Sequence, residues 1–476
     1  MNPFDKARYG ELLKGLEISE IKLSALERTW RLDPEFYSKA HLDIAARLKT
    51  NSAVSLTEFA DISDGNHIGV SDEFCAEGVP YFRGGDIKEF FLSFVHPEYC
   101  VPESIYAKPT MIRSHMKQGD VFVSIVGAII GQIGMKTDEA SALCSCKLGI
   151  LRPKKHKTSA YIAAFLLSDV GQSQISRYRR GSAQTGLILD DFEQLLVPCF
   201  SDGFYLGIDK MVSAALKARQ GSVESMKTAE EALLAELGLA GWTPTDEAIS
   251  VKTYLDFLSA ERFDAEYFQP KYDAIEGKIR GYRGGAVMAS DALVAGLVNE
   301  AAETSERYVE LADIGMSGEI SGCTSATFGE LPSRARQRME TGQVIVSSIE
   351  GSLDKCALVT SAFDKALCST GFHRFRSTAI NAETLLLLFK SWPIQQLMKR
   401  GCSGTILSAI LPGELSRVPL PLVDPKVQRN LAAKVQSSFA LRAESRRLLD
   451  LAKRAVETAI EQGEERAIAT IEREAH

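Results

Sequence analysis

The stretch RLDPEFY at residues 31–37 returns near the middle of the chain as RFDAEYF at residues 262–268. Both copies have the arginine, the aspartate, the glutamate and two closing aromatic residues in the same places. Four further pairs of segments follow in the same order, while the offset between the copies falls from 231 to about 220 residues. One such match arises easily by chance, whereas five in register indicate an internal duplication.

The other matched segments extend the duplication over both halves of the chain. They are YFRGGDI at 81–87 with YVELADI at 308–314, GDVFVS at 119–124 with GQVIVS at 342–347, RGS at 180–182 with RGC at 400–402, and Leu195, Val197 and Pro198 with Leu415, Val418 and Pro419. Residues 119–135 and 343–349 have the Val- and Ile-rich alternation of strands around glycine turns. Residues 161–168 and 384–389 are short apolar helical stretches. Each half is therefore predicted to be a mixed α/β domain that its proline closes.

A long helical segment follows each half. Apolar residues recur every three or four positions from Ile208 to Leu237, and again from Val427 to Ile460. Gly238 is a typical residue for the end of the first helix. Two such helices in one chain favour a mutual antiparallel coiled coil, although each helix packing on its own domain stays open. The predicted division is two domains at 1–203 and 241–424, with spacer helices at 204–240 and 425–476.

The composition excludes several classes of protein. The chain has 476 residues, of which 45% are hydrophobic, and a formal net charge of −7. No apolar run of about 18 residues predicts a membrane span, and the first residues, MNPFDKARYGELLKG, do not have the apolar core of a secretory signal. Nine cysteines without a disulfide framework fit the reducing cytoplasm. Phosphate-binding loops, hydrolase elbows and zinc-ligand spacings are missing from the sequence, so we expect no metal and no catalytic residue.

Positive charge is concentrated at matching places in the two halves. Residues 147–181 contain eight Lys or Arg and one Asp, and residues 355–400 contain seven Lys or Arg and two acids. Clustered cations bind DNA phosphates, and nearby Ser, Gln and Thr can contact phosphates or base edges. A solvated surface is the alternative for each cluster. The predicted DNA-contacting residues are Lys154, Lys155, Lys157, Arg177, Arg179, Arg180, Ser182, Gln184, Thr185, Arg334, Arg336, Arg338, Arg374, Arg376, Lys399, Arg400, Ser403 and Thr405.

The duplicated order of these motifs, with a long helix after each half, resembles the specificity (S) subunit of type I restriction–modification systems. The resemblance covers nearly the whole chain and implies two target-recognition domains joined by two long helices. It also implies that Asn66 and His67, in a loop that often touches DNA in this family, and Arg83 bind DNA. Residues Leu311-Ala312 and the loop 317–328 depart from the family pattern, so the contact residues there are less certain.

The resemblance further implies a chain without catalytic activity that binds double-stranded DNA and two methyltransferase subunits. Those partners hold S-adenosylmethionine and methylate adenine N6, and restriction subunits add ATP and Mg²⁺ where they are present. About 30 helical residues span ~45 Å, or about 13 base pairs, so two dissimilar half-sites with a fixed gap are expected. A specificity subunit of a type IIB-like enzyme, a coiled-coil scaffold for proteins, and an enzyme with a dispersed active site stay open as alternatives.

Overall fold

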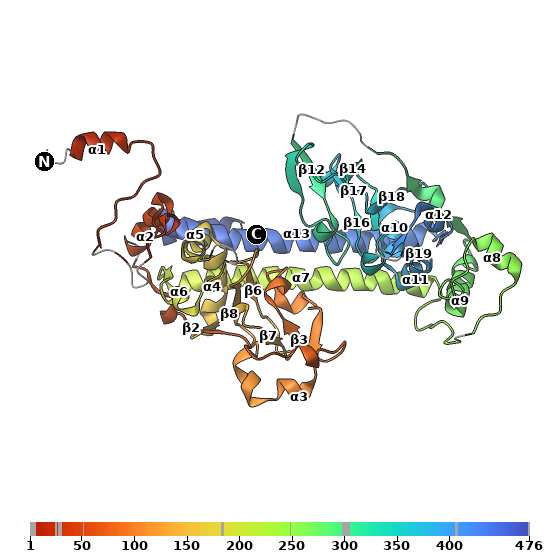
Figure 1. Cartoon of the computed structure of the whole chain (residues 1–476), viewed down its shortest axis with the longest axis horizontal. Coiled ribbons are helices and arrows are strands. Elements are labelled where there is room, and N and C mark those ends of the chain that lie inside the picture. The colour runs from red at the N-terminus through yellow and green to blue at the C-terminus, as the bar shows by residue number, and fades with distance from the viewer. Residues whose placement is uncertain are drawn as a thin grey trace. The chain divides into compact units, whose positions relative to one another are not determined.

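The computed structural model describes residues 6–23, 26, 31–50, 52–181, 185–247, 249–297, 305–404 and 408–474. The chain forms two compact units, one from residues 1–217 with 444–476 and the other from residues 218–443. The long helices α7 (Asp202–Glu236) and α13 (Pro425–Gln462) each contribute one part to each unit (Figure 1). Each unit is therefore completed by helical segments that are distant in the sequence.

Unit 1 contains two principal sheets. The first has the order β2-β8-β5-β6 and is antiparallel throughout. The second has the order β4-β3-β7, in which β3 and β7 are parallel. The strands are β1 (Val54–Ser55), β2 (Ala60–Asp64), β3 (Val79–Phe82), β4 (Tyr99–Val101), β5 (Val121–Ser124), β6 (Ile133–Met135), β7 (Leu143–Cys144), β8 (Leu148–Pro153) and β9 (Leu196–Val197), the last of which pairs with β1.

Unit 2 repeats this topology and has one more strand in its second sheet. Its first sheet has the order β11-β18-β15-β16 and is antiparallel, and its second has the order β13-β12-β17-β14, in which β12 and β17 are parallel. The strands are β10 (Ala286–Met288), β11 (Leu293–Val294), β12 (Ser305–Val309), β13 (Thr324–Thr327), β14 (Ala335–Arg338), β15 (Val344–Ser347), β16 (Cys356–Leu358), β17 (Leu367–Ser369), β18 (Phe372–Phe375), β19 (Cys402–Ser403), β20 (Ala409–Ile410) and β21 (Pro419–Pro421). The predicted duplication and the mixed α/β class are confirmed.

Several of the shorter helices also fall at equivalent places in the two units. Unit 1 has α1 (Lys6–Leu12), α2 (Lys39–Thr50), α3 (Glu103–Tyr106), α4 (Ser159–Leu167), α5 (Asp169–Tyr178) and α6 (Leu189–Glu193), and the end of the chain forms α14 (Glu464–Glu474). Unit 2 has α8 (Tyr254–Ala260), α9 (Pro270–Arg280), α10 (Ala382–Lys390), α11 (Trp392–Arg400) and α12 (Pro412–Leu415). The helices α4 and α10 are almost wholly buried, as their apolar sequences predict.

In both copies of the opening motif, the arginine binds the aspartate two residues later. Arg31 donates two hydrogen bonds to Asp33, and Arg262 does the same to Asp264. Each guanidinium also bonds a carbonyl more than 100 residues away, at Tyr178 for Arg31 and at Cys402 for Arg262. The arginine hydrogen bond lowers the pKa of each aspartate. The motif therefore ties the start of each domain to its end.

The apolar stripes of α7 and α13 pack together within each unit. In unit 1, Ile208 and Ala215 share a core with Leu451 and Ala455. In unit 2, residues from the last part of α7, such as Leu233, share a core with the first part of α13. The start of one helix thus meets the end of the other, so the predicted antiparallel pairing is confirmed.

Buried hydroxyls interrupt the apolar stripe in unit 2. Ser222 and Ser438 are both fully buried, and the Ser438 hydroxyl donates to the Ser222 carbonyl at 2.7 Å. Beside them Gly221 faces Leu441, and a Cβ on the glycine would lie 3.1 Å from that side chain. Small residues therefore bring the two helix backbones close together at this level.

Three local features differ from the sequence-based expectations or were not covered by them. The segment 425–476 is not one helix, because Gly463 (φ +94°) ends α13 and α14 follows. The cations at 334–338, which the sequence analysis assigned to no helix or strand, lie on and beside strand β14. Pro419 begins β21 and pairs with Met288 instead of ending the pairing, which the two-stranded sheet tolerates because proline fits an edge strand.

Among the described residues, no helix is long and apolar enough to cross a membrane.

Two glycine substitutions test the fold with opposite expected signs. A Cβ on Gly171, in α5, would collide with the Phe165 carbonyl oxygen, whereas a Cβ on Gly277, in α9, would meet no atom within 4 Å. We expect Gly171→Ala to lower the free energy of unfolding by about 1–3 kcal/mol. Gly277→Ala should raise it by about 0.5–1 kcal/mol, because alanine favours a helix. Urea unfolding of both variants checks this, and equal effects would contradict the described packing.

Candidate nucleic-acid interface

The most exposed positive cluster lies in unit 1, between β8 and α4. Lys154, Lys155 and Lys157 are all exposed there, in a loop that begins after Pro153 ends the strand. Among the described residues, none of the three ammonium groups has an ion-pair partner within 4 Å. The cluster therefore offers uncompensated positive charge to a polyanion.

The three arginines at the end of α5 differ in exposure: Arg177 is buried, Arg180 is partly buried and Arg179 is exposed. Arg177 is buried, donates to the Phe36 carbonyl at 2.9 Å and lies 4.1 Å from the centre of the Phe36 ring. Arg179 donates to the carbonyl of Ile130 at 2.7 Å. Arg180 forms an ion pair with the buried Asp191, whose pKa is raised by burial. Arg177 and Arg180 therefore have structural partners that offset or cover their charge, whereas Arg179 is accessible to solvent.

The loop after β2 contains a buried asparagine followed by an exposed histidine. Gly65 approaches the carbonyls of Cys144 and Ser145 so closely that a Cβ would collide with them. Asn66 is buried and bonds backbone groups of Ile68. His67 is largely exposed, and its Nε2 lies 2.7 Å from the carboxylate of Asp64. Asn66 therefore shapes the turn, and His67 faces solvent.

Arg83 follows the parallel strand β3. It bonds Glu98 at 2.9 Å and lies 4.1 Å from the centre of the Tyr99 ring, while its side chain remains 42% exposed. An exposed ion pair of this kind contributes about 0–1 kcal/mol, so a phosphate can compete with Glu98 for the guanidinium.

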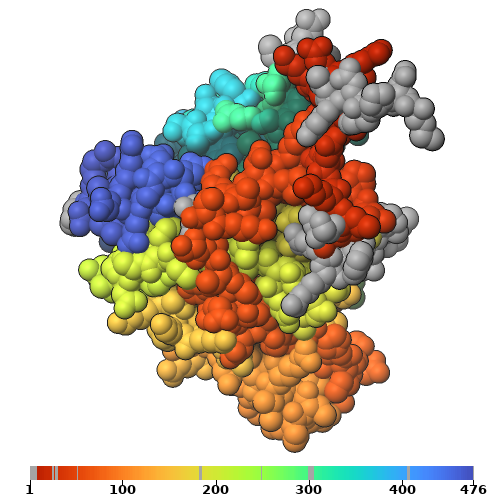
Figure 2. Space-filling view, turned by 90° about the vertical axis from the view of Figure 1, so that its left-hand side faces the viewer, coloured from red at the N-terminus to blue at the C-terminus, as the bar shows by residue number. Residues whose placement is uncertain are grey.

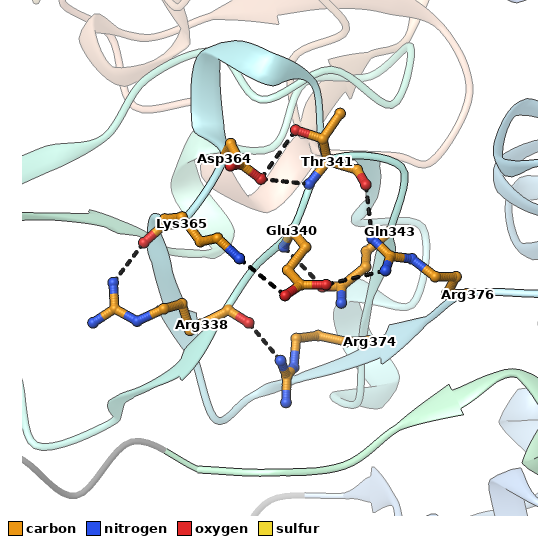
Figure 3. Close-up of polar contacts among 8 residues, drawn as sticks. All are labelled: Arg338, Glu340, Thr341, Gln343, Asp364, Lys365, Arg374 and Arg376. Atoms are coloured by element: carbon orange, nitrogen blue, oxygen red, sulfur yellow. Dashed lines mark hydrogen bonds and ion pairs between the residues drawn. The ribbon is translucent and has the colours of Figure 1, made fainter.

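In unit 2 the corresponding cations belong to a polar network (Figure 3). Arg374 is buried and donates to Gln337, to the Arg338 carbonyl and to the Gly296 carbonyl. Arg376 is half-exposed and bonds Glu340 at 3.0 Å. Arg374 therefore stabilises the interior of the domain, whereas Arg376 is accessible to solvent but forms an ion pair.

The three arginines around β14 differ in their surroundings. Arg334 bonds Glu310 at 2.9 Å, and Arg338 bonds Glu306 at 2.8 Å. Arg336 has no carboxylate partner among the described residues, and its guanidinium lies 4.6 Å from the centre of the Phe328 ring. Arg336 is thus the least neutralised of the three.

The segment at the end of α11 also contains both exposed and mostly buried predicted contact residues. Lys399 and Ser403 are exposed, but the Arg400 side chain is only 15% exposed and bonds Glu276 at 2.9 Å. Arg400 lines a cavity of about 530 Å³ together with acids such as Asp273 and Glu414, so its charge is offset. Thr185 is exposed. Ser182, Gln184 and Thr405 lie outside the described residues.

The described residues contain no group of three or more His, Cys, Asp or Glu side chains that could hold a metal ion. They show a set of exposed cations on two similar domains and a second set that is buried or paired within the domains. The structure does not test contact with DNA, so the contact assignments stay predictions. Arg113, which is 54% exposed and bonds Asp64, was missed by the sequence analysis.

No protein-family model and no curated protein matches the sequence. The solved structures to which the chain is similar include the type I restriction–modification S subunit from M. genitalium, with 13% identity and a TM-score of 0.38 over 86% of this chain and 94% of that one. The HsdS subunit from Thermoanaerobacter tengcongensis has 13% identity and a TM-score of 0.29 over 86% and 96%. The type IIG restriction endonuclease BpuSI has 12% identity and a TM-score of 0.29 over 38% and 28%. Likeness at this level does not assign a function, which has to rest on the residues of this chain.

The buried and exposed cations are expected to behave differently on substitution. Arg374→Ala removes three internal hydrogen bonds and should cost about 2–4 kcal/mol, because buried acceptors lose their donors. Lys155→Ala should change the free energy of unfolding by less than about 0.5 kcal/mol. Chemical denaturation of each variant distinguishes the two roles, and a stable Arg374→Ala protein would refute the structural role.

Proposed function

We propose that this chain is the DNA-recognition subunit of a type I restriction–modification complex. It binds a bipartite, asymmetric DNA site, positions two adenine-N6 methyltransferase subunits and has no catalytic activity itself. The observation that supports this most is the duplicated domain, in which the antiparallel four-stranded sheet has the same strand order in both copies and both copies expose cations on their surfaces. A single chain that reads two half-sites by itself needs two such copies.

Charge on the exposed surface fits a polyanionic partner. The lysines at 154, 155 and 157 are uncompensated, although the chain as a whole is acidic. A locally basic surface on an acidic chain concentrates DNA at one face and leaves the remaining surface unattractive to it. Phosphate contacts of this kind position the duplex, while side chains at base edges provide the specificity.

The two domains differ in the side chains that they expose. Unit 1 presents three lysines in the loop after β8, whereas the corresponding end of β18 in unit 2 carries Arg376, which is paired with Glu340. Different side chains read different bases, so the two half-sites should have different sequences. An asymmetric site follows from this difference.

The partner subunits are proposed from the family resemblance. Two equivalent domains provide two equivalent places for a methyltransferase, which would bring S-adenosylmethionine. ATP and Mg²⁺ belong to a restriction subunit where one is present. The exposed faces of α7 and α13, which include Glu231 and Arg454, are proposed docking surfaces. The specificity subunit of a type IIB-like enzyme is the closest alternative, and only the partner chain distinguishes it.

A coiled-coil scaffold that binds proteins is a second alternative, and DNA binding by the lysine loop separates it from our proposal. Replacing Lys154, Lys155 and Lys157 by alanine should weaken binding of the methyltransferase complex to duplex DNA. The negative slope of log K against log salt concentration should become shallower by up to about 2–3, because each phosphate contact contributes about −0.9 to the slope.

The matched control makes the same charge change at Lys22, Lys49 and Lys278, which are exposed and lie outside both the long helices and the predicted DNA-contacting residues, and it should leave the slope unchanged. Fluorescence anisotropy from 50 to 300 mM salt, which spans roughly the range where counterion release dominates, measures both variants. Equal slopes in the two triple variants would contradict a DNA-binding role for the loop.

The length of the helix pair should set the gap between the half-sites. Inserting seven residues beside Ser222 and seven beside Ser438, which face each other, lengthens both helices by about 10.5 Å and retains their pairing. The preferred gap should then increase by about three base pairs. Competition among duplexes with different gaps measures the preference, and an unchanged gap would show that the helices do not act as a ruler.

A further inference from the structure

Arg113 occupies the place in unit 1 that Arg336 occupies in unit 2. The two residues are 223 positions apart, which is also the distance between Gly119 and Gly342 in the duplicated strand motif. The backbone agrees, since His115 pairs with Leu143 of β7 as Arg338 pairs with Leu367 of β17. Arg113 and Arg336 each lie two residues before these pairs, so they are equivalent in the repeat.

A buried carboxylate fixes the orientation of Arg113. Its Nη2 forms an ion pair with Asp64 Oδ1, and its Nε donates to the Asp64 carbonyl at 3.2 Å. The Asp64 side chain is only 9% exposed, whereas that of Arg113 is 54% exposed. Asp64 itself ends β2, which is paired along its length with β8. The guanidinium is therefore anchored to the central sheet on one edge and open to solvent on the other.

The open edge has donors in a defined position. Within the described part of the chain, Arg113 Nη1 contacts no protein acceptor, and Nη2 retains a second hydrogen. His67, with a side chain 61% exposed, rests on the other oxygen of the same carboxylate at 2.7 Å. The segment that carries Arg113 belongs to the orange surface of unit 1 in Figure 2. One buried acid thus holds two exposed, nitrogen-bearing side chains side by side.

We propose that Asp64, His67 and Arg113 form a guanine-reading site for the half-site of unit 1, a statement that rests on the proposed function. The Asp64 charge offsets that of Arg113, so the pair attracts a phosphate less than the lysine loop does. What remains is directional hydrogen bonding. Guanine is the base that presents two acceptors, N7 and O6, on its major-groove edge, and the end of a fixed guanidinium matches them.

The counterpart in unit 2 is built differently. Arg336 donates its Nε to the Ser333 carbonyl at 3.1 Å and lies over Phe328, and no carboxylate holds it among the described residues. A guanidinium held in this way presents a different edge. The same repeat position therefore reads different bases in the two half-sites.

The test uses the complex of the full chain with its methyltransferase and a duplex that carries the site defined by the methylated adenines. We expect Arg113→Ala to reduce affinity for this duplex by about 10- to 100-fold and to leave binding to unrelated DNA nearly unchanged. Arg113→Lys should lose nearly as much, because a point charge does not donate two parallel bonds. Asp64→Asn should show an intermediate loss, and Lys108→Ala, at an exposed cation nearby, should show none.

Replacing each guanine of the first half-site by 7-deazaguanine removes N7 alone and identifies the contact. One replacement should weaken binding of the unaltered complex and cost the Arg113→Ala complex nothing further, as expected for two groups in contact. The guanine site would be overturned if the affinity losses from 7-deazaguanine and from Arg113→Ala were additive at every guanine. It would also be overturned if Arg113→Ala weakened binding to unrelated DNA equally, or if Arg113→Lys retained full affinity. An unaltered complex without any site-specific binding would overturn the proposed function itself.

Discussion

Packing between the two long helices is the interaction on which the rest of the structure depends. The last part of α13 completes the core of unit 1, and the first part of α13 completes the core of unit 2. Side chains such as Leu451 and Val435 are fully buried in these cores, and each buried aliphatic side chain contributes about 1.5–3 kcal/mol. Neither domain has a complete core without a helix that also belongs to the other, so the folding of both is coupled through the chain.

The repeat made much of this architecture predictable from the sequence. Matching segments in register identified both domains, and Gly119 and Gly342, which adopt positive φ before equivalent strands, mark the same turn in each copy. Periodicity identified the long helices, because a stripe of apolar residues every three or four positions requires a partner surface. The end of α13 at Gly463 was not predicted, because the sequence does not show that this glycine, within a strongly periodic segment, has a positive φ.

The candidate site was less predictable because counting charges does not reveal burial. Residues 147–181 carry a local excess of cations, yet Arg177 stacks on Phe36 and Arg180 neutralises Asp191. Those partners lie far away or later in the sequence, and only the fold brings them together. Arg113 is the reverse case: it is not part of a charge cluster in the sequence, yet it is exposed in the structure. The offset of 223 residues to Arg336 was the available signal.

These arrangements separate two physical tasks in unit 1. Lysines without partners supply long-range attraction that salt weakens, whereas a guanidinium fixed by a buried acid supplies direction with little net charge. Unit 2 differs, because Arg336 has no carboxylate partner among the described residues and Arg376 is paired with Glu340. Our proposal assigns the recognition of two dissimilar half-sites to this difference between the domains. Duplication of a single domain followed by divergence of its exposed side chains accounts for this.

Mapping methylated adenines in DNA from cells that express this chain with its proposed methyltransferase partner tests the central claim most directly. Two dissimilar short sequences separated by a gap of constant length, lost when this chain is deleted, are the predicted result. A single uninterrupted sequence, or a methylation pattern that persists without this chain, would contradict the account.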